Sequence, residues 1–162
     1  MDHQSNSSRY GATPLLLCFL LSITSFAQEN RPSLTFFGWS DQHTNTSGDT
    51  SRLHPFVDAM NTMAGTAWPK TVGGKVAKPS FVIGACDITE WPTHAAMTGY
   101  DSLLNNRLQF PAYDVLGNHD DGGRAFSPTM INWLKKKHGS LSYTFEKGGV
   151  VFIGLWSKFD PK

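Results

Sequence analysis

Three short apolar runs, separated by amphipathic segments, constrain the fold of this chain more than any other feature of the sequence. They lie at residues 33–41, 80–88 and 111–117. Between them, residues 49–65 and 93–108 carry apolar side chains at the spacing of one helix face. Strands connected through helices pair in parallel, and near-continuous apolar strands are typical of a sheet that is covered on both faces. The sequence therefore predicts an α/β fold built on a parallel sheet.

The segment after the third run predicts one more helix and then a hairpin. We expect Ser127 to cap this helix, Pro128 to occupy its first position and Gly139 to follow its last residue. Residues 141–157 predict two strands that are joined at residues 147–149. The complete order of elements is therefore predicted as β-α-β-α-β-α-β-β.

The composition fits a single globular domain and excludes one broad class of partner. The chain has 162 residues, of which 40% are hydrophobic and 17% charged, and its formal net charge is +1. This balance is not that of a polybasic nucleic-acid binder. The basic cluster at residues 135–137 falls at the predicted end of a helix, where cations are favoured. We therefore predict no nucleic-acid binding, whereas the sequence leaves the oligomeric state open.

The N-terminus has the pattern of a secretory signal peptide. Residues 15–26 form an apolar or hydroxyl stretch, and Ser25 and Ala27 are small residues at the two positions that a signal peptidase reads. We predict a signal peptide at 1–27, a leader at 28–33 and a secreted or periplasmic protein. A retained membrane anchor is the alternative. The stretch is shorter than the roughly 20 residues that a span needs, so we expect no stable membrane span.

Each apolar run is followed directly by side chains that can bind metals. The first run ends in Asp41 and His43, the second in Asp87 and Glu90, and the third in GNHDD at 117–121. Since ligands collect at the carboxyl ends of parallel strands, we expect these side chains at one edge of the sheet. Carboxylates, imidazoles and amide oxygens bind divalent metals, and an aspartate between two metals can bridge them. A flavodoxin-like or Rossmann-like module is disfavoured, because no glycine-rich turn follows the first run.

The motifs at these run ends also resemble the pattern of the calcineurin-like metallophosphoesterases. They are DQH at 41–43, CDITE at 86–90 and GNHD at 117–120, in the order of that family's Asp-x-His, Gly-Asp-x-x-Asp/Glu and Gly-Asn-His-Asp/Glu motifs. The resemblance runs from about Leu34 to the end of the chain. It implies that residues 34–162 form the N-terminal portion of a metallophosphoesterase domain. The fold would be an incomplete calcineurin-like phosphoesterase β-sandwich with flanking helices.

The resemblance implies a centre that holds two divalent metal ions, which could be Mn, Fe or Zn. Asp41 and His43 would bind the first metal, Asp87 would bridge the two metals, and Asn118 would bind the second. For Glu90 two interpretations stay open, a supporting position behind these ligands and a solvated surface position.

The resemblance further implies a phosphoesterase reaction. A metal-bound hydroxide would hydrolyse a phosphomonoester, a phosphodiester or a pyrophosphate, so the partner would be a phosphorylated small molecule or another phosphoester. His119 would face the substrate as general acid, or as a donor to developing negative charge. Asp120 would orient His119 and fix its tautomer.

Two departures from the family's pattern bear on this function. Cys86 stands where the family usually has glycine before the bridging aspartate. We expect Cys86 to point away from Asp87 in an extended strand and to pack as a small hydrophobe, with a thiolate ligand as the alternative. The family's later histidine motifs are absent, and His54, His94 and His138 are predicted at surfaces or helix ends. The alternative function is therefore a catalytically inactive, truncated metal-binding or interaction fragment.

Overall fold

The elements of the structure confirm the predicted order of strands and helices. The computed structural model describes residues 33–156, so the expected signal peptide at 1–27 and almost all of the leader lie outside the described residues. The elements are β1 (Phe37–Ser40), a short 3-10 turn η1 (Ser51–Leu53), α1 (His54–Thr62), β2 (Val82–Ala85), α2 (His94–Asn106), β3 (Ala112–Val115), α3 (Thr129–His138), β4 (Tyr143–Lys147) and β5 (Val150–Gly154).

The first three strands form the predicted parallel sheet. Its strand order is β1-β2-β3, both neighbouring pairs are parallel, and Trp39, Gly84 and Asp114 stand side by side across it. Each strand has 4 residues, fewer than its apolar run. The ladder stops early because the backbone leaves the extended region at Asp41 and Cys86, where φ is 55° and 66°. The motifs therefore lie in loops, directly after the strands.

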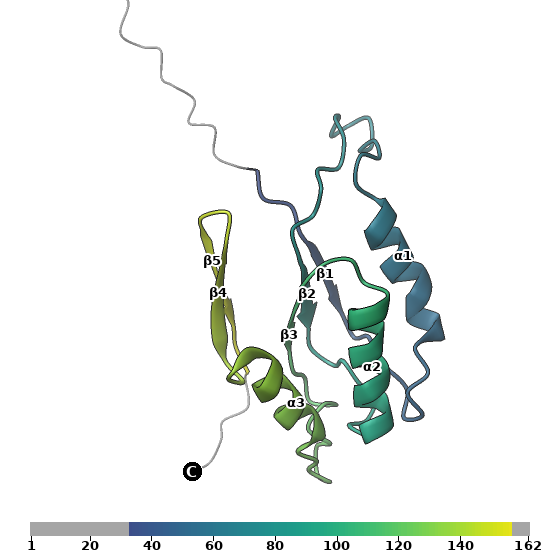
Figure 1. Cartoon of the computed structure of the whole chain (residues 1–162), viewed down its shortest axis with the longest axis vertical. Helices are drawn as coiled ribbons and strands as arrows, with labels where there is room; N and C mark the ends of the chain where they lie inside the picture. Colours follow the sequence, from purple (N-terminus) through teal and green to yellow (C-terminus); the bar gives the residue numbers. More distant parts are fainter. Residues whose placement is uncertain (1–32, 157–162) are drawn as a thin grey trace, which may run out of the picture. The chain divides into compact units, whose positions relative to one another are not determined.

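The helices pack against one face of this sheet and enclose the main core (Figure 1). The core joins apolar side chains from all three helices to the helix-facing positions of the strands. Members of this cluster are Val57, Tyr100, Leu103, Met130, Leu134, Val82 and Ala112. Within residues 33–156, none of the helices is long and apolar enough to cross a bilayer.

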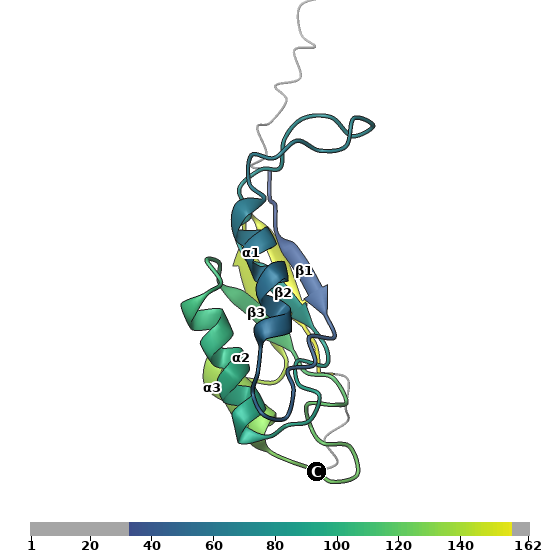
Figure 2. The same ribbon diagram turned by 90° about the vertical axis from the view of Figure 1, so that its right-hand side faces the viewer.

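A hairpin of β4 and β5 packs against the other face of the sheet through aromatic rings (Figure 2). The Phe81 ring lies 5.4 Å from that of Phe145 and 5.1 Å from that of Phe152, and Tyr113 stacks on Phe145. Such contacts bury large apolar areas in a defined geometry. The fold of residues 33–156 is thus mixed α/β, with three helices and two sheets.

The two ends of α3 match the prediction to different degrees. Gly139 follows the last residue with φ 80°, as predicted, and its amide donates to the Lys135 carbonyl at 2.8 Å. The helix begins at Thr129, so Pro128 and not Ser127 is the N-cap residue, and that part of the prediction is wrong. The Ser127 hydroxyl instead donates to the Pro92 carbonyl at 3.2 Å, which ties the start of α3 to the loop before α2.

Asp114 is the centre of a buried polar network that the sequence patterns did not reveal. Its carboxylate is fully buried, accepts a 2.8 Å hydrogen bond from the Tyr100 hydroxyl and lies 2.7 Å from the Lys137 ammonium. Gly84 leaves room for it, because a Cβ there would lie 2.2 Å from Asp114 Oδ1. Burial, with the charge of Asp114 second, raises the pKa of Tyr100 well above its ordinary value. The Tyr100 hydroxyl therefore keeps the proton that it donates.

Candidate metal centre

Two loops with left-handed backbone carry predicted ligands at the carboxyl edge of the sheet. After β1, Asp41 and His43 have φ of 55° and 44°. After β2, Cys86 and Asp87 have φ of 66° and 47°. No other non-glycine residue within residues 33–156 has a positive φ. Such conformations cost about 1–3 kcal/mol each and persist only where the surroundings hold them, often at functional sites. The backbone strain is thus concentrated in two of the three predicted motifs.

Backbone hydrogen bonds connect these two loops. The amide of Asp41 donates to the carbonyl of Cys86 at 3.2 Å, and the amide of His43 donates to the carbonyl of Asp87 at 3.0 Å. The amide of Thr44 donates a third hydrogen bond from the first loop to the second. Since these bonds continue the direction of the β1-β2 ladder past the ends of the strands, the two loops are held side by side.

These hydrogen bonds between the loops bring three of the predicted ligands together. Asp41, His43 and Asp87 each offer a ligand atom, and these atoms all lie within 4.8 Å of one another. His43 Nε2 is 3.8 Å from Asp41 Oδ1, and the side chains of this pair are 29% and 62% exposed. The two loops therefore bring these side chains together at the edge of the sheet through left-handed backbone, and not through an extended segment.

The loop after β3 holds Asp87 in place from the other side. The backbone amide of His119 donates to Asp87 Oδ1 at 3.1 Å. Gly117 lies against the same carboxylate, since a Cβ at this position would stand 2.0 Å from Asp87 Oδ1. Any side chain larger than hydrogen at residue 117 would displace Asp87. The glycine of the GNHD motif is therefore required by close approach.

The His119 ring lies beside His43, with 4.7 Å between the ring centroids and nearly perpendicular planes. Its Nδ1 is 2.9 Å from the backbone carbonyl of Glu90. Because a carbonyl can only accept, Nδ1 carries a proton and donates it, which leaves Nε2 for other partners. This hydrogen bond raises the pKa of His119, and although desolvation opposes the rise, the charge of Asp87 adds to it.

Asp120 has a different place from the expected one beside His119. Its buried carboxylate accepts hydrogen bonds from the Gly117 amide at 2.9 Å, the Ile88 amide at 3.1 Å and both the amide and hydroxyl of Thr89 at 2.8 and 2.9 Å. Desolvation raises the pKa of Asp120, while these four bonds oppose the rise. The predicted orientation of His119 by Asp120 is corrected, because the Glu90 carbonyl holds the ring. Asp120 ties the third loop to the second.

Cys86 does not pack as a small hydrophobe, so this expectation is wrong. The residue is exposed, lies beyond the end of β2 and has φ of 66°, a conformation in which glycine is favoured. Desolvation, followed by the charge of Asp87, raises the pKa of the Cys86 thiol. The cluster of possible ligand atoms within residues 33–156 does not include the Cys86 sulfur, so the thiolate alternative gains no support.

Asn118 and the Glu90 side chain lie at the surface of the site. Asn118 is exposed between Gly117 and His119, and its side chain forms no hydrogen bond within residues 33–156. Glu90 supports the site through its backbone, while its side chain lines a cavity of about 310 Å³ together with His43, Asn45 and Arg52. The structure thus shows the clustering of Asp41, His43 and Asp87, and Asn118 stays a predicted ligand in the loop whose His119 amide contacts Asp87.

The clustered donors fit one divalent cation. Two carboxylates and an imidazole are a common donor set for such ions. Like charges brought close together disfavour one another, and a cation between them removes that penalty. The close approach of Gly117 leaves Asp87 Oδ1 little freedom to move away. Asp41, His43 and Asp87 would therefore hold the ion, with solvent-accessible positions left for other ligands.

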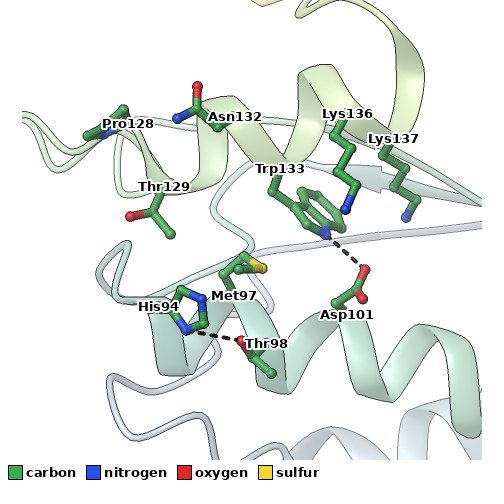
Figure 3. Close-up of a pocket in the computed structure, with 10 residues that line it drawn as sticks. All are labelled: His94, Met97, Thr98, Asp101, Pro128, Thr129, Asn132, Trp133, Lys136 and Lys137. Carbon is green, nitrogen blue, oxygen red and sulfur yellow. Dashed lines mark hydrogen bonds between the residues drawn. The ribbon is translucent and has the colours of Figure 1, made fainter.

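The larger cavity of the described region lies elsewhere, between α2 and α3. It has a volume of about 700 Å³ and is lined by Met97, Trp133 and polar side chains of the two helices (Figure 3). Trp133 Nε1 donates to Asp101 at 2.8 Å, and His94 lies at the start of α2, a helix end as predicted. None of the clustered ligands lines this cavity. The larger cavity and the cluster of metal-binding atoms therefore lie in different parts of the structure. We assign the candidate site to the cluster, because its donor atoms can bind a metal ion.

No protein-family model matches the chain, and no curated protein sequence matches it either.

Proposed function

We propose that this protein is a metal-dependent phosphoesterase with a calcineurin-like domain. The observation that carries the proposal is the convergence of Asp41, His43 and Asp87, whose ligand atoms lie within 4.8 Å of one another. These residues come from loops after neighbouring parallel strands, where ligands collect in such sheets. The resemblance of three motifs to the calcineurin-like metallophosphoesterases supports the same assignment and adds Asn118 as a ligand of a second ion. Manganese, iron and zinc all suit these donors.

Each residue has a task in the proposed hydrolysis of a phosphate ester. A bound divalent ion supplies Lewis acidity and lowers the pKa of a water that it holds. Asp87 stays fixed through the His119 amide and the close approach of Gly117. His119 keeps its Nδ1–H on the Glu90 carbonyl, so that the imidazolium form donates the Nε2 proton to the leaving oxygen and is left neutral, with its remaining proton on Nδ1.

A metal-binding fragment without hydrolytic activity is the second candidate. It is favoured by the size of the clustered donor set, since within residues 33–156 only one imidazole joins the two carboxylates. Catalytic dinuclear sites need ligands for both ions and an open position for substrate. The two candidates share the metal site and differ only in turnover.

Metal titration combined with an activity assay tests both candidates. We expect the full chain to bind Mn²⁺ or Zn²⁺ in calorimetry and to hydrolyse p-nitrophenyl phosphate or its bis ester. Asp87→Asn should remove both properties, whereas Asp58→Asn should change neither, because Asp58 pairs with Arg107 on the surface, away from the cluster. Binding without hydrolysis would favour the second candidate. The absence of saturable binding of either ion would refute the metal site itself.

A further inference from the structure

Arg52 contacts the backbone of the loop that carries Asp41 and His43. It belongs to η1, and its Nη2 donates to the carbonyl of Gln42 at 2.6 Å and also to the carbonyl of His43. These carbonyls belong to the two peptide units on either side of the His43 Cα. One guanidinium nitrogen thus fixes the direction of two successive carbonyls in the loop.

This loop needs external support, because its conformation is unfavourable by itself. Asp41 and His43 both have left-handed φ, which the isolated backbone disfavours in non-glycine residues. Gln42 between them is buried, and its side-chain amide has no hydrogen-bond partner within residues 33–156. A charged donor to two carbonyls is one of the stronger hydrogen-bond arrangements available to hold such a turn.

The segment that carries Arg52 is itself held by side-chain hydrogen bonds to its backbone. Asp49 accepts a hydrogen bond from the Ser51 amide at 2.9 Å, and Asn45 Oδ1 accepts one from the Asp49 amide at 3.0 Å. Leu53, the next residue after Arg52, is buried in the core. The backbone of Arg52 is therefore anchored between these hydrogen bonds and the core, and its guanidinium reaches the carbonyls of Gln42 and His43 from this turn.

We propose that Arg52 is a positioning residue for the metal centre. Its hydrogen bonds to the Gln42 and His43 carbonyls hold the loop so that the Asp41 carboxylate and the His43 imidazole meet Asp87. The proposal rests on the proposed metal site, but it makes a separate claim about the loop. Without the Arg52 bonds, the chain keeps its fold while the first two ligands lose their fixed geometry.

Three variants test this role. Arg52→Met keeps the alkyl stem and removes both hydrogen bonds. Arg52→Lys restores a cation that can donate to the carbonyls, without the rigid planar fork of arginine. Arg107→Met is the matched control, since Arg107 is another exposed arginine with two hydrogen bonds, to Asp58, that lie away from the cluster. Thermal unfolding of each variant confirms that it is folded.

Two readouts separate the role of Arg52 from the proposed function. The first is the NMR signal of the His43 ring in the metal-free protein, together with its nuclear Overhauser contact to the His119 ring. We expect both to change in Arg52→Met and to recover in part in Arg52→Lys. The second is Mn²⁺ affinity, which should fall about tenfold in Arg52→Met, as for other residues that orient metal ligands, with Arg52→Lys in between.

Unchanged His43 signals and unchanged Mn²⁺ affinity in Arg52→Met would overturn the proposal. Equal effects of Arg52→Met and Arg107→Met would do the same, because they would indicate a general charge effect. If the unmodified chain binds no metal, the proposed function fails, and the metal-free His43 signal still decides whether Arg52 positions the loop.

Discussion

Asp114 and Asp87 lie on or directly after neighbouring strands of one sheet, yet their surroundings are opposite. Asp114 is fully buried and satisfied by the Tyr100 hydroxyl and the Lys137 ammonium. Asp87 is partly exposed, shares a small volume with another carboxylate and an imidazole, and receives a backbone amide. A carboxylate that finds its counter-charge inside the protein is structural. The carboxylates of Asp41 and Asp87 converge without such a counter-charge, which is the arrangement that the proposed cation would complete.

The backbone shows the same contrast. Around Asp114 the chain is regular strand and helix, and the strain of the described region is confined to the loops with Asp41, His43, Cys86 and Asp87. Removing Asp114 should therefore damage the fold, while changes at the loop ligands should damage binding. The following variants are ordered by the size of the effect that we expect.

Asp114→Ala should have the largest effect on stability. It leaves the Lys137 ammonium, whose side chain is 25% exposed, without its ion-pair partner and with only the face of the Trp133 ring beside it. Breaking a buried ion pair from one side typically lowers the free energy of unfolding by about 3–5 kcal/mol. Urea unfolding measures this change, and Tyr100→Phe should give a smaller loss of about 1–3 kcal/mol, because it removes one hydrogen bond.

Asp41→Ala is the corresponding variant in the loops with left-handed backbone. The Asp41 side chain is 62% exposed, so its loss should change the free energy of unfolding by no more than about 0.5 kcal/mol. Equal destabilisation by Asp41→Ala and Asp114→Ala would contradict the division into a structural and a binding carboxylate.

Gly117→Ala should come next, since it affects both stability and metal affinity. The new Cβ would meet Asp87 Oδ1 at 2.0 Å, and such overpacking costs about 1–3 kcal/mol in the free energy of unfolding. We also expect Mn²⁺ affinity to fall about tenfold or more. Gly38→Ala is the matched control, because a Cβ there has no atom within 4 Å. Wild-type affinity in Gly117→Ala would show that Asp87 needs no fixed position.

The next prediction concerns the pH dependence of stability and involves His138, which lies beside the Asp114 network. Burial, followed by the charge of Lys137, lowers the pKa of His138 to about 4. In the unfolded chain a histidine has a pKa of about 6.5, so between these values the unfolded state binds more protons. This contribution to stability is complete above about pH 6.5 and is lost as the pH falls toward 4.

His138→Phe should remove this dependence while keeping the ring stack on Tyr143, whose centroid lies 4.2 Å away. Allowing for the partial exposure of the ring, we expect the wild type to lose about 1–2 kcal/mol more than the variant as the pH falls from 7 to 4. Thermal unfolding across this range measures the difference. Parallel curves for the two proteins would contradict the lowered pKa of His138.

Cys86→Gly should have a small effect on stability, and of the opposite sign. It relieves a left-handed conformation that costs a side chain about 1–2 kcal/mol, while glycine costs about 0.5–1 kcal/mol in unfolded-state entropy. The free energy of unfolding should therefore rise by about 0.5–1 kcal/mol. Cys86→Ser keeps a Cβ at the same φ of 66° and should give no gain. A loss of stability in Cys86→Gly would mean that the thiol makes a favourable contact.

Much of the fold follows from local sequence patterns. Apolar runs and helical spacing predicted the strands, the helices and the parallel sheet, and Gly139 marked the end of α3 correctly. These features depend on residues that are close in sequence, where periodicity and capping preferences act. The same patterns placed the motifs after the strands, which brought Asp41, His43 and Asp87 to one edge.

The details of the site depend on contacts between distant segments, which no local pattern encodes. Asp120 bonds to Ile88 and Thr89, over 30 residues earlier in the chain, and so takes a place that sequence alone did not predict. The left-handed φ of Cys86 could have been predicted, because the family that the motifs resemble usually has glycine at this position. Export through residues 1–27, the absence of nucleic-acid binding and the two-metal centre stay predictions.

The backbone hydrogen bonds between the loops after β1 and β2 restrict the number of residues in the first loop. Three amides of the first loop, those of Asp41, His43 and Thr44, each donate to one particular carbonyl of the second, as Asp41 does to Cys86 and His43 to Asp87. An insertion of one residue before Thr44 would move every later amide to a different carbonyl, whatever side chain it carried. Variation here is therefore restricted in spacing before it is restricted in residue type. Relatives of this chain should vary more in the length of the turn at residues 69–74, beyond the Ala67–Lys75 bridge, than between β1 and Thr44.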